Sequence, residues 1–332
     1  MADLTTKYLG LTLKNPIIIG SSGLTNSVEN IVELEKAGAG AVVLKSLFEE
    51  QIILETEADL RKAYKDDHIY TAKSEALDYL DIKIRKDTLD EYIGMLKAIK
   101  AATTIPVIAS VNCVSATEWT FFAKRIEEAG ADALELNIAV LPSDPGLEAS
   151  DIEKIYFDII SKVKGSISIP LAVKFSPYFT NLASIITRLS ETGIKGMVMF
   201  NRFYTPDFDI SNFSEKSSNT FSTPAETANV LRWIAIMSGR VKVDIAASTG
   251  VHDGNTLIKQ LLAGAKTVQL VSAIYNNGVG HLQNLLFELE NWMDKKEYKT
   301  IDDFRGKLAQ GSSNNPAAYE RIQFMKYFSE IV

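Results

Sequence analysis

The chain has a single cysteine, Cys113, among its 332 residues. One cysteine cannot form an intramolecular disulfide, which fits a reducing compartment, and it cannot supply the ligand set of an iron–sulfur cluster. The opening "MADLTTKYLGLTLKNP" lacks a basic region followed by an apolar stretch, so it does not resemble a secretory signal. No run approaches the length of about 18 apolar residues that a transmembrane helix needs. We therefore expect a cytoplasmic protein that does not enter a membrane.

Positive charge is also scarce. Lys and Arg number 35 against 42 Asp and Glu, which gives a net charge of −7. Nucleic-acid binders and anionic-membrane binders need clustered Lys and Arg, so both classes are disfavoured. Apolar residues make up 46% and charged residues 23%, as in ordinary globular proteins with a sizeable core. Without a linker or a low-complexity stretch, residues 1–332 are predicted to form one domain, and we assign no metal site.

Short apolar, β-branched runs recur along the whole chain. They are continuous rather than alternating, which is typical of parallel strands buried on both faces. The runs are "PIIIGS" from Pro16, "AVVLKS" from Ala41, "PVIASV" from Pro106, "ALELNI" from Ala133, "PLAVKF" from Pro170, "GMVMFN" from Gly196, "VDIAAST" from Val243 and "TVQLVSA" from Thr267. Eight such runs predict eight parallel strands.

Amphipathic helical segments separate most of these runs and end in glycine, a residue that suits the end of a helix. We expect one helix to start at Ser27 or Asn26 and stop at Gly38, and another to run from an N-cap at Asn255 to Gly264. The alternation predicts a (β/α)8 TIM barrel. A doubly wound sheet is less favoured, because no G-x-G-x-x-G follows the first strand. Longer insertions, roughly 47–90 and 202–225, follow strands 2 and 6, on the face where barrel active sites lie.

Polar side chains stand where most of the predicted strands end. A single terminal Asn is usually a turn former and a single terminal Lys is usually solvated. Several such side chains at one barrel mouth are harder to explain as turn formers and solvated lysines, because a buried lysine needs an anion. The segments "STG" and "SAIYNNG" follow strands 7 and 8, where barrels commonly bind phosphate. A planar, hydrogen-bonding cofactor with a phosphate is indicated, and flavin mononucleotide (FMN) fits.

Several longer blocks of the sequence are more specific than these single strand-end residues. "DLTTKYLGLTLKNPIIIGSSG", "IPVIASVNC", "AKRIEEAGADALELN", "IPLAVKFSPYFTN" and "ASTGVHDGNTLIKQLLAGAKTVQLVSAIYNNG" occur in this order. They resemble the soluble dihydroorotate dehydrogenases and the pyrimidine-reducing domain of dihydropyrimidine dehydrogenase, over about residues 3 to 290. The resemblance implies FMN as cofactor, oxidation of dihydroorotate to orotate in pyrimidine (UMP) biosynthesis, and a homodimer.

Carried over position by position, the resemblance also implies the site residues. The implied flavin contacts are Ser21, Ser22, Gly23, Lys45, Ser46, Asn112, Asn137, Lys174, Asn201, Thr249, Gly250, Val271 and Ser272, the last four at the phosphate. Lys174 would lie by the pyrimidine edge of the flavin, where a cation favours the anionic reduced form. The small, anionic substrate would meet Lys45, Asn137, Asn201 and Arg202, with Lys45 also in a catalytic role.

The chain departs from the family at the catalytic base. The family has Asn-x-x-Cys or Asn-x-x-Ser after strand 4, and counting from Asn137 this position is Val140. Valine cannot accept a proton. One interpretation is a dihydroorotate oxidase with a displaced base, for which Ser143, Asp144 and Cys113 are candidates. The others are an FMN-dependent paralogue acting on a different small anionic substrate, which Arg202 would pair, and a non-catalytic flavin-binding protein.

Overall fold

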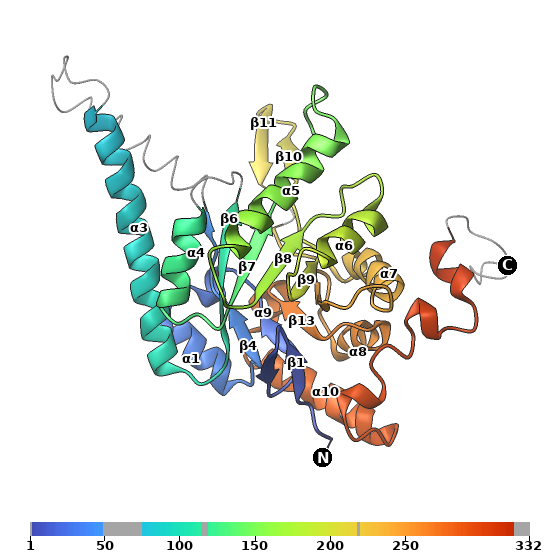
Figure 1. Cartoon of the computed structure of the whole chain (residues 1–332). Coiled ribbons are helices and arrows are strands. Elements are labelled where there is room, and N and C mark those ends of the chain that lie inside the picture. The colour runs from blue at the N-terminus through green and yellow to red at the C-terminus, as the bar shows by residue number, and fades with distance from the viewer. Residues whose placement is uncertain (1, 49–74, 114–118, 218–219, 322–332) are drawn as a thin grey trace.

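A computed structural model describes residues 2–48, 75–113, 119–217 and 220–321 (Figure 1). The chain opens with an antiparallel hairpin, formed by β1 (Thr6–Tyr8) and β2 (Leu11–Leu13). The parallel strands that follow are β3 (Ile17–Ile19), β4 (Ala41–Val43), β6 (Val107–Cys113), β7 (Ala133–Ile138), β8 (Leu171–Phe175), β9 (Gly196–Met199), β12 (Asp244–Ser248) and β13 (Thr267–Leu270). Each coincides with one of the apolar runs identified in the sequence.

These parallel strands close on themselves. Each pairs with the next along the chain, and β13 returns to pair with β3, with Val268 opposite Ile17. Between β4 and β6 the register sets Val42 opposite Val107. The two-residue strand β5 (Leu47–Phe48) lies after β4 and adds to β6 at the carboxyl end. The predicted (β/α)8 barrel is confirmed.

Helices pack around the barrel (Figure 1). They are α1 (Val28–Lys36), α3 (Glu75–Ala102), α4 (Trp119–Glu128), α5 (Ala149–Lys164), α6 (Leu182–Ser190), α7 (Thr227–Met237), α8 (Gly254–Ala263), α9 (Ser272–Asn277) and α10 (His281–Lys295). Short 3-10 turns are η1 (Gly23–Thr25), η2 (Pro224–Glu226), η3 (Ile301–Asp303), η4 (Gln310–Ser312) and η5 (Pro316–Glu320). No helix in the described ranges is long and apolar enough to cross a membrane.

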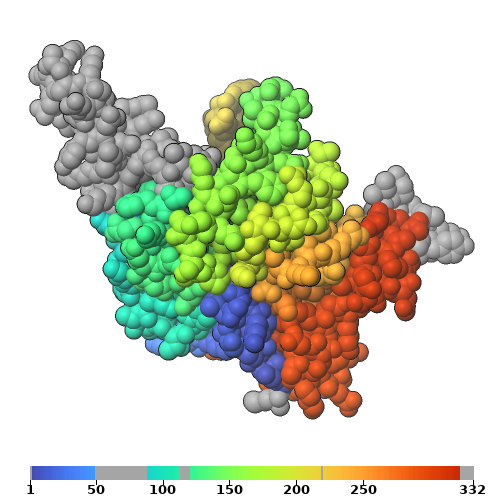
Figure 2. Space-filling model, in the orientation of Figure 1, coloured from blue at the N-terminus to red at the C-terminus, as the bar shows by residue number. Residues whose placement is uncertain are grey.

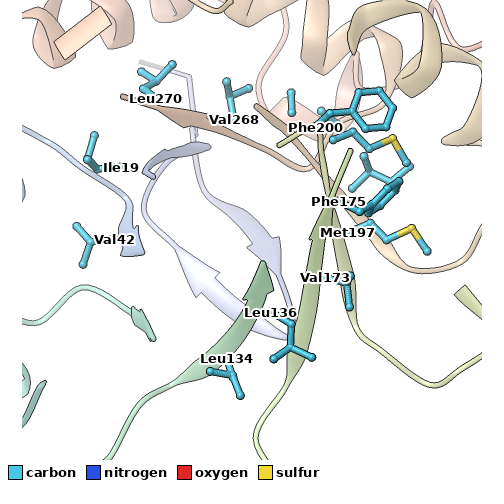
Figure 3. Close-up of a cluster of buried hydrophobic side chains, with 14 of the residues drawn as sticks. Ile19, Val42, Leu134, Leu136, Val173, Phe175, Met197, Phe200, Val268 and Leu270 are labelled. Carbon is cyan, nitrogen blue, oxygen red and sulfur yellow. The ribbon is translucent and has the colours of Figure 1, made fainter. Parts of the chain in front are cut away.

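The apolar core lies between the strands and the surrounding helices. Figure 3 shows buried side chains on the outer face of the strands, among them Leu134, Leu136 and Val173. The strand alternation that turns these residues outward turns their neighbours into the barrel. Every second position of a strand therefore points to the interior that holds the site.

The expected helix boundaries are partly confirmed. Ser27 is the N-cap of α1, its Oγ accepting from the Asn30 N–H, and Gly264 ends α8 with a positive φ of 114°. The N-cap predicted at Asn255 is wrong, because Asn255 lies within α8 and Asp253 caps it by accepting from the Thr256 N–H. Aspartate is as good a cap as asparagine, and the two stand only two residues apart.

The N-terminal hairpin closes the floor of the barrel. Tyr8 and Leu9 are buried at 0% and 2% exposure inside a ring of small and β-branched residues, namely Ala41, Val43, Ile108, Ala133, Ala172, Val198 and Ala246. A Cβ atom on Gly196 would lie 2.5 Å from Cδ2 of Leu9. The strands carry small residues at this level because hairpin side chains fill the space. The opposite, carboxyl end is left for a ligand.

Both predicted insertions follow the expected strands. Residues 49–74 of the first lie outside the described residues, and its remainder forms the start of α3, whose bounds are given above. The second contains a hairpin of β10 (Pro206–Asp209) and β11 (Ser214–Ser217). Figure 2 shows this hairpin, in yellow, and the green segment before α5 projecting from the top of the molecule. They flank the carboxyl end of the barrel.

Candidate functional site at the barrel mouth

A line of hydroxyl groups crosses the first three barrel strands at their carboxyl ends. The Oγ atoms of Ser21 and Ser46 are 2.9 Å apart, and those of Ser46 and Ser110 are 2.7 Å apart. The backbone N–H of Ser46 also donates to Ser21 Oγ at 2.8 Å. Ser21 and Ser46 follow β3 and β4 and line the mouth, whereas Ser110 lies within β6 and is fully buried beneath them.

The mouth encloses a cavity of about 460 Å³. Its polar lining is Ser21, Ser46, Asn112, Glu135, Asn137, Lys174, Asn201 and Arg202, and its apolar lining is Phe48, Ala139, Leu141, Phe203 and Tyr204. Six predicted flavin contacts are therefore brought together: Ser21, Ser46, Asn112, Asn137, Lys174 and Asn201. The buried Oδ1 atom of Asn137 has no hydrogen-bond partner, so this acceptor is available to a ligand donor.

A second cavity of about 240 Å³ adjoins the first and shares Ser21, Lys174, Asn201 and Arg202 with it. It lies at the ends of β12 and β13 and includes all four residues predicted at the phosphate: Thr249, Gly250, Val271 and Ser272. Thr249 and Gly250 have positive φ angles of 79° and 78°. A Cβ on Gly250 would lie 2.4 Å from the backbone nitrogen of Thr227, so only glycine fits this turn.

Ser222, from the insertion after β9, reaches into this second cavity. Its Oγ accepts from the Gly250 N–H at 3.3 Å and lies 3.2 Å from Nε2 of His252. Its own N–H donates to Ser272 Oγ at 2.9 Å. Ser222 thus occupies hydrogen-bonding groups that a phosphate would use. It was missed in the sequence, where it is one of many polar residues between 211 and 222.

Three buried polar side chains meet below the mouth. Gln269 donates from Nε2 to Glu135 Oε2 at 2.6 Å, and its Oε1 accepts from Lys174 Nζ at 3.2 Å. Burial raises the pKa of Glu135, although Lys174 and Gln269 oppose the rise. Burial lowers the pKa of Lys174, although Glu135 opposes the fall. Glu135 and Gln269 were also missed, and the available signal was a charged or amide residue inside a buried apolar run.

Three predicted flavin contacts line neither cavity. The Lys45 side chain is exposed and lines neither cavity, and its three predicted roles stay predictions. Ser22 Oγ accepts from the Leu24 N–H and donates to the carbonyl of Gly20, as the cap of η1. Gly23 faces the ring of Tyr275, whose hydroxyl would lie 2.6 Å from a Cβ at this position.

Two of the candidate bases, Ser143 and Asp144, line neither of the two cavities. Ser143 and Asp144 are exposed, and Asp144 Oδ1 accepts from the Gly146 N–H in a local turn. Cys113 ends β6, and its side chain lies outside the described part of the structure. Val140 packs against the main core, whereas its neighbours Ala139 and Leu141 line the mouth.

Arg202 lines both cavities but already has an internal anion. Its Nε donates to Glu226 Oε1 at 2.7 Å, and its Nη1 donates to the carbonyl of Thr220 at 3.1 Å. Burial tends to raise the pKa of Glu226, but the hydrogen bond and charge of Arg202, together with the hydrogen bonds from Thr223, outweigh it and the pKa is lowered. Glu226 therefore stays ionised and holds Arg202 in place. The predicted pairing of Arg202 with a substrate carboxylate would have to compete with this ion pair.

The fold and the cavities define a class of protein: a TIM barrel with a polar, lysine-containing mouth and an adjoining second cavity at the ends of β12 and β13. Residues 3–293 match the protein family described as "Dihydroorotate dehydrogenase". Because the match spans most of the chain, the chain belongs to the dihydroorotate dehydrogenase family. Its relatives are oxidoreductases, so the chain is of the dihydroorotate dehydrogenase type.

Individual relatives are distant. The chain is 26% identical to the dihydroorotate dehydrogenase B (NAD(+)) catalytic subunit of Thermoplasma volcanium, over 92% of this chain and 98% of that protein. It is 26% identical to dihydroorotate dehydrogenase A (fumarate) of Lactococcus lactis, over 92% and 99%. A crystal structure of DHODH from Eimeria tenella, in complex with ferulenol, superposes with a TM-score of 0.63 at 18% identity, covering 92% of this chain and 88% of that one. This last likeness supports the fold.

Proposed function

We propose that the chain is an FMN-dependent oxidoreductase that oxidises dihydroorotate, or a closely related dihydropyrimidine, in pyrimidine biosynthesis. One observation carries the proposal. The mouth cavity and the cradle at the ends of β12 and β13 adjoin, and between them they contain most of the residues that the family resemblance implies for a flavin. A polar ring site beside an anion cradle suits a cofactor with a planar ring and a phosphate.

The residues present fit such a cofactor. The positive-φ turn at Thr249 and Gly250, with Ser272 at the start of α9, offers N–H and hydroxyl groups to a phosphate. In the mouth, the unpartnered Oδ1 of Asn137 suits an N–H donor of the ring. When bound, FMN supplies the capacity to accept a hydride from carbon. To accept a phosphate, the cradle has to displace the Ser222 hydroxyl or share its hydrogen bonds with it.

The protein's own part in the reaction is electrostatic and positional. Lys174 places a positive charge in the mouth cavity, which favours negative charge on a bound electron acceptor. Asn112 on β6, Asn137 on β7 and Asn201 just after β9 would fix the plane of a ring between them. Phe48, Leu141, Phe203 and Tyr204 add an apolar lining to the cavity, against which a substrate would exclude water.

The visible spectrum of the purified protein tests the cofactor. We expect a bound flavin that is bleached when dihydroorotate is added under anaerobic conditions. Dithionite bleaching serves as the control for a reducible flavin. Protein that carries no flavin, and takes up none on titration with FMN, would refute the proposal. The homodimer implied by the resemblance stays a prediction that light scattering can test.

A second candidate is a redox paralogue with a different small substrate. One observation favours it: Ala139 and Leu141, rather than a titratable residue, line the mouth after β7. A site without a base near the substrate carbon cannot remove its proton efficiently. Flavin that is reduced by dithionite but not by dihydroorotate would support this alternative. A non-catalytic flavin-binding protein would also carry flavin that dithionite reduces and dihydroorotate does not. That interpretation fails if any small dihydro-compound bleaches the flavin.

A further inference from the structure

Glu135 is a buried acid that the proposed reaction does not use. It lies on β7 between Leu134 and Leu136, which point to the outer core (Figure 3), so its own side chain enters the barrel. It is 1% exposed, yet it is one of the residues that line the mouth cavity. An acid in this place is costly unless something compensates its charge.

Gln269 links the Glu135 carboxylate to the positive charge of Lys174. Because the amide nitrogen of Gln269 donates to Glu135 Oε2, the amide oxygen is turned toward Lys174 and accepts from its ammonium. Glu135 thereby sets which end of the amide faces Lys174. The second carboxyl oxygen, Oε1, is buried and has no hydrogen-bond partner. It is therefore a free acceptor for a proton.

The charged and titratable groups around Glu135 come from three elements. Lys174 on β8 supplies the positive charge. From the hairpin below, Tyr8 interacts with Glu135, and Asp244 on β12 interacts with Tyr8. The pKa of Tyr8 is raised well above its usual range by burial first, then by Glu135 and Asp244. Tyr8 therefore keeps its proton throughout the neutral range.

We propose that Glu135 takes up a proton from solvent, through the mouth cavity, when a flavin bound at the mouth is reduced. The inference rests on the proposed function. At rest the Glu135 carboxylate balances Lys174. Two electrons delivered to the mouth add negative charge beside this pair, which makes a second buried anion unfavourable. Protonation of Oε1 restores the balance and leaves Lys174 charged against the reduced cofactor. The proton forms an O–H bond on a carboxylate, and no further oxidant or reductant is needed.

Redox titration of the flavin-loaded protein against pH counts these protons. The reductant is dithionite with a viologen mediator, and the slope of the midpoint potential with pH gives the protons taken up per two electrons. We expect one proton more in the wild-type protein than in Glu135→Gln, which keeps the side-chain shape and cannot be protonated. The control Tyr8→Phe removes the titratable group that faces Glu135 from the hairpin and should keep the wild-type count.

Equal proton counts in the wild-type protein and Glu135→Gln would overturn the inference while leaving the proposed function intact. A protein that binds no flavin would overturn both. If Glu135→Gln does not fold, infrared difference spectra of the wild-type protein on reduction decide the matter. A new protonated-carboxyl band, shifted in deuterated water, supports the inference, and its absence overturns it.

Discussion

At the residue scale, two neighbouring residues, Ala139 and Val140, are candidates for the position of the missing catalytic base. Counting along the family pattern places it at Val140, but the Val140 side chain packs against the core and Ala139 lines the mouth. We expect Ala139→Cys to speed anaerobic bleaching by dihydroorotate about 10²-fold, the usual minimum for a positioned general base. We expect Val140→Cys to change the rate little. Faster bleaching in Val140→Cys than in Ala139→Cys would show that the family count, and not the observed packing, describes the working site.

Gly196 is the residue on which the barrel floor depends most directly. A Cβ there would lie 2.5 Å from Leu9 Cδ2, within a ring that is already filled. We expect Gly196→Ala to lower the free energy of unfolding by about 1–3 kcal/mol through overpacking. In Gly94→Ala the new Cβ meets nothing within 4 Å and lies in the interior of α3. This control should raise the free energy of unfolding by about 0.5–1 kcal/mol. Urea denaturation measures both, and a harmless Gly196→Ala would mean that the hairpin can shift.

At the scale of elements, α1 and α4 each hold, in the same way, the segment that enters a later barrel strand, β6 and β8 respectively. Oε1 of Glu35, near the end of α1, accepts from the N–H and hydroxyl of Thr104 and from the Ile105 N–H, just before β6. Oε1 of Glu127, near the end of α4, accepts from the corresponding groups of Ser168 and Ile169, just before β8. The carboxylates satisfy N–H groups that no strand partner reaches.

The hydrogen bonds to the Glu127 carboxylate make part of the protein's folding stability depend on pH. The Ser168 hydroxyl lowers the pKa of Glu127, partial burial opposes it, and the Ser168 and Ile169 N–H groups lower it further. A lowered acid pKa adds stability that is complete above the unfolded value of 4.5 and is lost as the pH falls below it. We expect Glu127→Gln to be less stable than the wild-type protein by about 1 kcal/mol at pH 7. The difference should shrink in more acidic solution.

Denaturant titrations between neutral and acidic pH follow this difference. The neighbouring substitution Glu128→Gln is the matched control, because the Glu128 side chain is exposed, and its effect should stay within about 0.5 kcal/mol. A difference between Glu127→Gln and the wild-type protein that does not change with pH would mean that the Glu127 contacts stabilise by shape alone.

Elements also show what the sequence can and cannot predict. The barrel strands were predictable because each is a local apolar run, and most of the polar residues expected at their ends line the mouth, although Lys45 does not. The β10–β11 hairpin was not predictable, since its strands are exposed and lack an apolar face. Gln269 and Glu135 were hidden for the opposite reason. They stand inside apolar runs, and only the closure of the barrel brings β13 and β7 across from one another.

On the scale of the whole molecule, the barrel divides into a floor that stabilises the fold and a mouth that binds the ligand. The hairpin fills the floor with Tyr8 and Leu9, while the mouth keeps unpartnered polar atoms such as Asn137 Oδ1. Polar atoms without a hydrogen-bond partner do not stabilise the fold, whereas buried apolar side chains stabilise it strongly. Stability and cofactor affinity should therefore respond to different substitutions.

Leu9→Ala and Asn201→Ala test this division. Leu9 is 2% exposed in the floor, so its truncation should lower the free energy of unfolding by about 2–5 kcal/mol and leave FMN affinity of the folded protein unchanged. Asn201 lines both cavities, and its backbone N–H, which donates to the Phe175 carbonyl, survives the substitution. Asn201→Ala should weaken FMN binding about tenfold and shift stability by no more than about 0.5 kcal/mol. Fluorescence titration with FMN and urea denaturation of both variants give the four values. A single variant that strongly changes both FMN affinity and the free energy of unfolding would show that floor and mouth are coupled.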